Sequence, residues 1–199
     1  MAVRIPVNGK DMKAERKHLT QNQKHDYLKR LILCLMILLC AVLQNTPHCF
    51  PTIAGCHAWL LLPLCVCISM FEKELSGVFY CIFAGALWDA VSAALDGMNA
   101  IYFFLASTAV ILLMTYLMRN NLVTALLLSL GVVLLYTLLH WLIFVVFRGV
   151  SGAGYQLVRF YLPSALYTYA FTPLFYIIVR SFLKRLRAKY PKNSIAHRP

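Results

Sequence analysis

Residues 85 to 97, Gly85-Ala-Leu-Trp-Asp-Ala-Val-Ser-Ala-Ala-Leu-Asp-Gly97, hold two acidic side chains in a chain that is otherwise strongly apolar. Of its 199 residues, 61% are hydrophobic and only seven are Asp or Glu. The mean hydropathy is +0.70. Because soluble domains use only roughly 45–50% apolar residues, this composition indicates a membrane protein. Asp89 and Asp96 therefore call for a specific explanation.

Six apolar segments come close to the length of about twenty residues that a helix needs to cross a bilayer. We therefore expect an all-α, polytopic membrane protein that forms one six-helix transmembrane bundle. No repeat of the length typical of solenoids is visible. The expected segments are Leu28 to Thr46, Ile53 to Phe71, Ser76 to Leu95, Asn99 to Met118, Leu122 to Phe147 and Phe160 to Val179.

Positive charge is concentrated at the two ends of the chain. Residues 1 to 30 contain eight Lys or Arg and three acids, and residues 180 to 199 contain seven Lys or Arg and no acid. Since Lys and Arg mark cytoplasmic segments, we expect both termini in the cytoplasm, which an even number of crossings satisfies. We expect basic tails at 1–27 and 184–199 around a membrane domain at 28–183, with residues 148–159 forming an external loop.

Two interpretations of the basic tails remain open. They attract anionic lipid, as juxtamembrane Lys and Arg do, or they dock a cytoplasmic partner. Nucleic acid is disfavoured as a partner because stacking aromatic residues are not interleaved with the charges. The residues from 184 to 190 are expected to continue the last helix. The candidate docking residues are Lys184, Arg185, Arg187 and Lys189.

Asp89 lies on a face of small residues in the third expected segment. At four-residue spacing this face carries Gly77, Cys81, Gly85, Asp89 and Ala93. Small residues at this spacing let a second helix backbone approach closely. The segment as expected places Asp89 just beyond the bilayer centre, where an Asp costs about 2.5–3.5 kcal/mol on insertion scales. We therefore expect it to face another helix or a wet cavity.

Three roles remain open for Asp89: a polar contact between close-packed helices, proton or ion chemistry, and contact with a partner or ligand. A packing role predicts that Asp89→Asn is tolerated and that Asp89→Leu, which adds bulk, is not. An ionic role predicts that both changes are equally damaging. Asp96 and Gly97 are expected to form the turn before the fourth segment, where Gly accepts a positive φ.

Other polar residues give little support for catalysis. The chain has no Gly-rich phosphate loop, G-x-S-x-G or H-E-x-x-H motif, so we expect no enzyme, no cofactor and no metal. Glu72 and Glu74 are interpreted as solvated loop charges, and His140 as a histidine bonded to a neighbouring helix. Most of the seven cysteines are expected to pack as small apolar residues. The pairs His48-Cys49 and Cys56-His57 offer zinc-type ligands, or a Cys49 to Cys56 disulfide if their side is oxidising. Zinc is disfavoured because the spacing fits no known ligand pattern.

Several stretches together resemble the MreD family, the rod shape-determining membrane proteins of bacteria. They are Glu72-Lys-Glu-Leu-Ser-Gly77, Gly85-Ala-Leu-Trp-Asp89, Gly97-Met-Asn-Ala100, Tyr116-Leu-Met-Arg-Asn-Asn-Leu122, Leu138-Leu-His-Trp141 and Tyr161-Leu-Pro-Ser-Ala-Leu-Tyr-Thr168. The resemblance covers roughly residues 28 to 187. It implies a non-catalytic component of the cell-elongation machinery, embedded beside MreC, linked to actin-like MreB, and working with the RodA glycosyltransferase and a penicillin-binding transpeptidase. The family's Gly and Asp positions correspond to Gly85, Asp89 and Gly97.

The alternative is a substrate-binding S-component of an energy-coupling-factor vitamin transporter, which has a similar six-helix layout. S-components present an Ala-x-x-x-Ala face on their first helix. Here the first segment contains only Ala41, and the series Ala86, Ala90 and Ala94 lies in the third segment instead. This placement favours the MreD interpretation.

Overall fold

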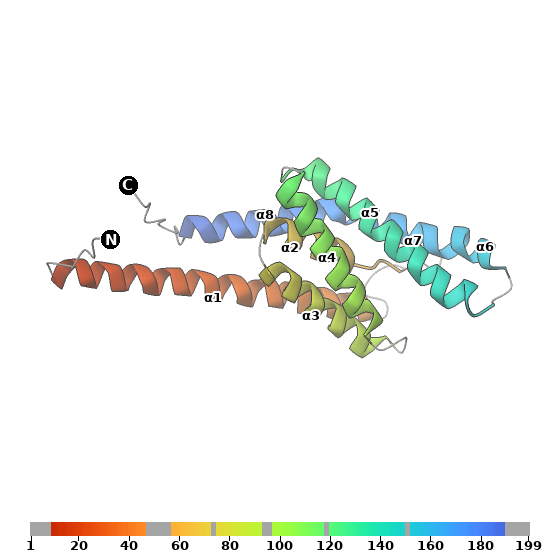
Figure 1. The fold of residues 1–199 in the computed structure, drawn as a ribbon, viewed down its shortest axis with the longest axis horizontal. Helices are drawn as coiled ribbons and strands as arrows, with labels where there is room; N and C mark the ends of the chain where they lie inside the picture. The colour runs from red at the N-terminus through yellow and green to blue at the C-terminus, as the bar shows by residue number, and fades with distance from the viewer. Residues whose placement is uncertain are drawn as a thin grey trace.

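A computed structural model describes residues 9–46, 57–72, 75–92, 97–117, 120–149 and 152–189, and in these ranges every regular element is a helix. Along the chain these elements form six successive rods, where a rod is either one helix or a run of consecutive helices (Figure 1). The first four are α1, α2, α3 and α4; α5 continues into the π-helical turn η1; and α6, η2, α7 and α8 form the sixth. Their bounds are α1 Gly9–Asn45, α2 Leu61–Phe71, α3 Leu75–Val91, α4 Met98–Tyr116, α5 Leu122–Trp141, η1 Leu142–Val146, α6 Ala153–Gln156, η2 Leu157–Tyr161, α7 Leu162–Ala170 and α8 Thr172–Lys189.

The short helix α2 forms the centre of the bundle. Ten of its eleven residues are buried, and it contacts α1, α3, α4, α5, α7 and α8. A helix that is apolar on all sides has no face for water and is stable only when it is surrounded. The sequence of α2, Leu-Leu-Pro-Leu-Cys-Val-Cys-Ile-Ser-Met-Phe, meets that condition. The other rods therefore pack around α2.

The second expected segment, Ile53 to Phe71, is wrong at its start, because the helix begins only at Leu61. Pro63 explains this start: proline has no N–H to donate and clashes with the carbonyl four residues earlier, so it is tolerated in the first turn only. Neighbouring rods bind the N–H groups at this end. Leu61 N–H donates to Gln44 Oε1 at 3.1 Å, and Trp59 N–H donates to Thr168 Oγ1 at 2.9 Å.

The expected external loop from Arg148 to Arg159 is also wrong over much of its length, because the chain is helical again from Ala153. The sixth rod therefore begins before Phe160 and ends beyond Val179. Two prolines mark its irregularities. Pro163 follows the π-helical turn η2, a widened turn that relieves the clash of the proline ring with the carbonyl of residue 159. Pro173 follows the break between α7 and α8, which lies at Phe171.

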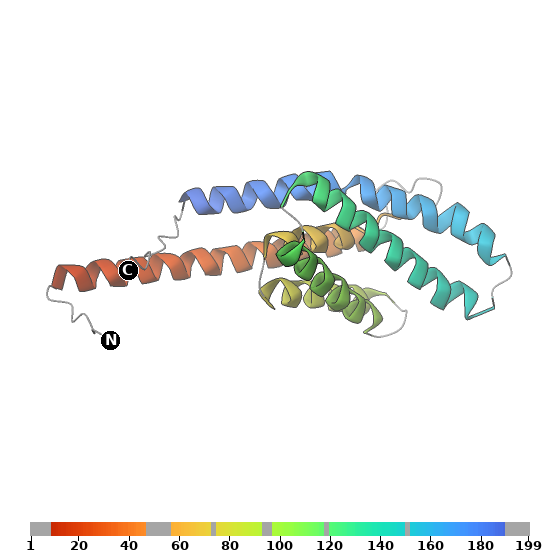
Figure 2. The same cartoon turned by 45° about the horizontal axis from the view of Figure 1, so that its top comes forward.

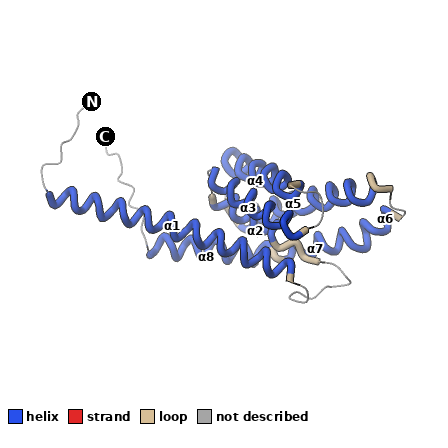
Figure 3. The backbone as a smooth tube through the Cα atoms, turned by 90° about the horizontal axis from the view of Figure 1, so that it is seen from below, coloured by secondary structure: helices blue, strands red, loops and turns tan. Residues whose placement is uncertain are grey.

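The start of α1 and the end of α8 lie at the same end of the molecule, beyond the remaining helices (Figures 2 and 3). Residues 9 to 27 of the expected basic tail belong to α1, which runs unbroken from Gly9 to Asn45. The basic stretch from residue 184 continues α8 to Lys189, as expected. Both charged ends are therefore helical extensions of the bundle.

Length and composition identify helices that can cross a membrane. In the described part of the chain three qualify, at Met98–Tyr116, Leu122–Val146 and Gly154–Leu186, whereas α2 and α3 are shorter apolar helices. Many large apolar side chains point outward, including Leu105, Leu127 and Leu166, which are 59%, 57% and 70% exposed. Lipid is the solvent that such a surface requires. The protein is an all-helical membrane protein, and the count of six crossings remains a prediction.

Glu72 was expected to be a solvated loop charge, and this is wrong. It follows α2, is only 8% exposed, and forms an ion pair with Lys29 of α1. A carboxylate this buried is retained only with a charged partner. The pair ties the middle of α1 to the end of the central helix.

Candidate functional site

Asp89 lies where α3 meets the beginning of α4. Its Oδ1 accepts hydrogen bonds from the backbone N–H of Asn99 at 3.1 Å and from Asn99 Nδ2 at 2.8 Å. Its Oδ2 accepts one from the backbone N–H of Ala100 at 2.9 Å. Both carboxylate oxygens are therefore bonded to the first turn of α4. Since α3 ends at Val91 and not at Leu95, Asp89 belongs to the last turn of α3 rather than to its middle.

This arrangement supplies α4 with an N-terminal cap from another helix. The first N–H groups of any helix have no partner within it, and a side chain at the N-cap position normally accepts from them. Here the N-cap residue is Gly97, which has no side chain, with φ of 83° as expected for the turn. Asp89 takes over this role, and its negative charge lies at the positive end of the α4 dipole.

Gly85, one turn before Asp89, allows α4 to come close enough for these bonds. A Cβ atom at Gly85 would lie 2.6 Å from Ala100 Cα and 2.9 Å from Asn99 O. Both are backbone atoms that cannot rotate away. On the same face, a Cβ at Gly77 would lie 3.0 Å from Glu72 O. Gly85 and Asp89 thus act together: the first removes the steric obstacle, and the second binds the N–H groups.

The hydrogen bonds continue from Asn99 to α5. Asn99 is buried, and its Oδ1 accepts from Tyr136 Oη at 2.9 Å. The Tyr136 ring packs against Trp88 of α3 and Trp59 before α2, with centroids 5.5 and 5.2 Å away. Asn99 and Tyr136 are site residues that were not predicted from the sequence. The one signal in the sequence was an Asn two residues after Gly97, in the first turn of an apolar helix.

His140 lies one turn further along α5. Its Nδ1 is 3.2 Å from Tyr161 Oη of η2, and its ring stacks on Phe144 with centroids 4.4 Å apart. The contact to a neighbouring rod agrees with the expectation from sequence. Tyr136 separates His140 from Asn99 and Asp89. The Tyr136 and His140 rings are 5.7 Å apart, so a ring contact, and not a hydrogen bond, joins the Asp89–Asn99–Tyr136 chain of hydrogen bonds to His140 and Tyr161.

Chemically, the hydrogen bonds at Asp89 hold one helix against another. Three of the roughly four acceptor positions of this carboxylate are taken by amide N–H donors, which do not titrate. General acid or base catalysis needs a titratable group within hydrogen-bonding reach of a reacting atom. The described partners of Asp89 are two backbone amides and one side-chain amide. Helix capping therefore explains why an acidic residue lies at this position of α3.

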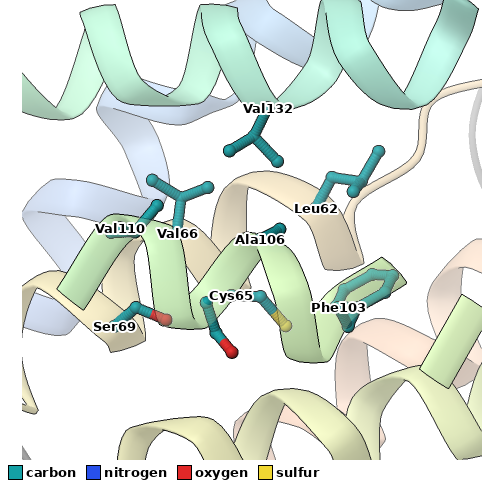
Figure 4. Close-up of a pocket in the computed structure, with 9 residues that line it drawn as sticks. Leu62, Cys65, Val66, Ser69, Phe103, Ala106, Val110 and Val132 are labelled. Carbon is teal, nitrogen blue, oxygen red and sulfur yellow. The ribbon is translucent and has the colours of Figure 1, made fainter. Parts of the chain in front are cut away.

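A gap between α2, α4 and α5 is lined mostly by apolar side chains (Figure 4). The lining residues are Leu62, Cys65, Val66 and Ser69 of α2, Phe103, Ala106, Ser107 and Val110 of α4, and Val132 of α5. Cys81 lies nearby, with its Sγ 3.3 Å from Ser69 Oγ and 3.6 Å from the carbonyl of Cys65. These contacts fit cysteines that pack as small side chains.

The remaining candidate residues are only partly described. Ala93 lies outside the described residues, as do Cys49 and Cys56. Lys184 and Arg185 are exposed on α8. Arg187 and Lys189 belong to the same helix, but their side chains are outside the described part. Gly77, Gly85 and Asp89 therefore lie along the contact of α3 with α4, Gly97 is the N-cap of α4, and the four basic residues lie near the C-terminal end of α8.

A comparison with protein families matches the chain to one family. The model of the rod shape-determining protein MreD matches residues 25–186, which include every described residue of the site. Comparisons with curated proteins and with solved structures find no match. The likeness to the S-component layout thus remains a prediction from the sequence. Because the family match spans most of the chain, from within α1 to α8, this protein belongs to the MreD family of rod shape-determining membrane proteins.

Proposed function

We propose that this chain is a non-catalytic scaffold of the cell-elongation machinery that holds MreC and MreB beside the RodA glycosyltransferase and a penicillin-binding transpeptidase. Membership of the MreD family supports a role in the rod-shape system. The observation that carries the scaffold role is the capping of α4 by Asp89. The polar site at α3 maintains the shape of the bundle, as a scaffold requires.

The parts of the bundle are proposed to contribute differently. The joined α3 and α4 present a rigid membrane surface to MreC, because Gly85 and Asp89 fix their contact. The basic end of α8 is the proposed contact for MreB on the cytoplasmic side. The location of the start of α1 and the end of α8 at one end of the molecule supports placing both charged ends on the same side of the membrane.

The direct test is to extract the protein from native membranes with a mild detergent and to identify the proteins that copurify. The proposal predicts MreC and the elongation synthases among them, and loss of MreC from a Gly85→Leu variant. Gly131→Leu is the matched control, because a Cβ at Gly131 meets no atom within 4 Å. Copurification of an ATPase pair with a coupling subunit would contradict the proposal and support a transporter.

A separate test addresses the α8 contact. Reversal of Lys184, Arg185, Arg187 and Lys189 to Glu is expected to abolish the recruitment of MreB filaments. Positive charge also sets topology, so correct insertion of the variant is verified first. Normal recruitment of MreB by the correctly inserted variant would refute this contact while leaving the MreC contact intact.

A further inference from the structure

The end of α5 and the start of α6 extend beyond α1, α3 and α4 at the outer end of the molecule, the end opposite the two charged helix ends (Figures 1 and 2). A hydrogen bond marks where α4 begins relative to α5, because Asn99 in the first turn of α4 binds Tyr136. We call α5 beyond Tyr136, together with η1, α6 and η2, the outer arm. In the described part of the chain, the principal contacts of η1, α6 and η2 are with α5, with α7 and with one another. The other rods therefore leave the surface of the outer arm uncovered.

The uncovered surface of the outer arm is apolar. Its exposed side chains include Val146, Phe147, Tyr155, Val158 and Phe160. Phe147 and Val158 are 76% and 65% exposed. Transfer of one large apolar side chain from water to an apolar medium is favourable by about 1.5–3 kcal/mol. Such a surface therefore favours hydrocarbon over the water outside the membrane.

Two arginines lie at nearly one level of the outer arm. The guanidinium of Arg148 lies over the Phe144 ring, 5.1 Å from its centroid, and Arg159 Nη1 donates to Tyr155 Oη at 2.7 Å. Phe144 lies four residues beyond His140, and Tyr155 lies six residues beyond the η2 tyrosine whose hydroxyl is 3.2 Å from the His140 ring. At about 1.5 Å per residue, both guanidinium groups lie about 6–9 Å beyond that contact.

The level of the two arginines fits the edge of a bilayer. From Leu122, where α5 begins, to Phe144 is 22 residues, or about 33 Å along the helix, and the hydrocarbon core is about 30 Å thick. Arg within the hydrocarbon costs about 2.5–3.5 kcal/mol on insertion scales, whereas Arg at its edge reaches the polar headgroups. The last acid of the chain is Asp96, so the arm carries positive charge only, which complements phosphate.

We propose that the outer arm is immersed in the outer leaflet of the membrane and that Arg148 and Arg159 bind phosphate groups of its lipid headgroups. Arg pairs with phosphate through two parallel hydrogen bonds. The first turn of α4 is bonded to Tyr136, eight residues before Phe144, and so lies about 12 Å inside this phosphate layer. Hydrocarbon offers no water to helix N–H groups, which explains why α4 takes its cap from Asp89. This membrane placement does not depend on which proteins the scaffold holds.

Cysteine labelling of the full-length protein in protoplasts tests the placement, with a maleimide that does not cross membranes and with the wild-type chain as background. Phe147→Cys, after η1, is expected to be labelled from outside. Leu138→Cys and Ile101→Cys, at positions 51% and 63% exposed, are expected to stay at background because lipid covers them. Labelling after denaturation measures the amount of each variant. Equal labelling of all three variants in protoplasts, or background labelling of Phe147→Cys, would overturn the proposal.

A second set of variants tests the arginines in the Phe147→Cys chain. Arg148→Gln with Arg159→Gln removes both cations, so the arm is expected to sink into the membrane and the labelling of residue 147 to fall. Arg148→Lys with Arg159→Lys keeps both cations and is expected to keep the labelling. Unchanged labelling in the Gln variant would overturn the proposal.

The purified protein in vesicles of phosphatidylglycerol and phosphatidylcholine separates lipid from a protein partner. The proposal predicts the same order of labelling as in protoplasts, with Phe147→Cys labelled and Leu138→Cys protected. Protection of Leu138→Cys in protoplasts but not in vesicles would show that a partner protein, and not lipid, covers the outer arm, and would overturn the proposal.

Discussion

The carboxylate of Asp89, in the last turn of α3, accepts a hydrogen bond from the backbone N–H of Ala100, in the first turn of α4, over 2.9 Å. The same carboxylate binds both the backbone and the side chain of Asn99. One residue of α3 therefore serves as the N-terminal cap of the next helix.

Gly85→Ala is expected to destabilise the bundle, because the new Cβ would meet the Ala100 backbone at 2.6 Å. Overpacking of this kind costs about 1–3 kcal/mol. Gly131→Ala is the matched control in α5, where the added methyl group meets no atom within 4 Å. It is expected to leave stability unchanged or to raise it by about 0.5–1 kcal/mol, the helix preference of Ala over Gly. Thermal unfolding in detergent measures both, and equal effects would contradict the close approach.

The ion pair between Lys29 and Glu72 is expected to couple α1 to the end of α2. Lys29→Met and Glu72→Gln, made singly and together, are expected to show an interaction free energy of at least about 0.5 kcal/mol in a double-mutant cycle. Pairing Glu72→Gln with Arg148→Met provides the control, since Arg148 lies after η1 over the Phe144 ring. Additive effects for Lys29 and Glu72 would mean that the pair contributes nothing to the fold.

Both ends of the chain are expected on the cytoplasmic side, because the basic end of α8 and the basic start of α1 lie at one end of the molecule and positive charge stays inside. A reporter enzyme that is active only outside the membrane is fused after Pro199. We expect it to be silent, and the same reporter fused after Gly149 is expected to be active. External activity of the fusion after Pro199 would disprove this topology.

The small-residue face of α3 could be predicted from the spacing of Gly77, Gly85 and Asp89, because four-residue spacing alone puts residues on one side of a helix. The N–H groups that bind Asp89 could not be predicted from the sequence. They depend on which backbone groups of another helix remain unbonded, and only the packed structure brings Ala100 to that point. The need for a polar contact was therefore visible in the sequence, but its identity as a helix cap was not.

The limits of the helices show the same difference between features set by nearby residues and features set by contacts between distant segments. The composition of residues 53–71 predicts one long apolar segment, yet Pro63 confines the helix to residues from Leu61 onward. Glu72 looked like a loop charge because its partner, Lys29, is more than forty positions away in the sequence. The break at Phe171 has a local cause in the sequence, Pro173 two residues later. Local signals fix where helices start and break, whereas the partners of buried charges depend on contacts between distant segments.

Replacement of Asp89 is the most direct test of the capping of α4 by this residue. The structure refines the expectation that Asn is tolerated: Asp89→Asn keeps an oxygen for Asn99 but turns an NH₂ group toward the N–H of Ala100, whereas Asp89→Leu keeps no acceptor. Loss of a helix cap costs about 0.5–2 kcal/mol. The measurement is thermal stability together with the shape of cells that depend on each variant at equal protein level. We expect thermal stability to fall in the order wild type, Asp89→Asn, Asp89→Leu, with rod-shaped cells for Asp89→Asn and round cells for Asp89→Leu. Round cells with Asp89→Asn at unchanged thermal stability would contradict the capping role and show that the carboxylate itself carries protons or ions.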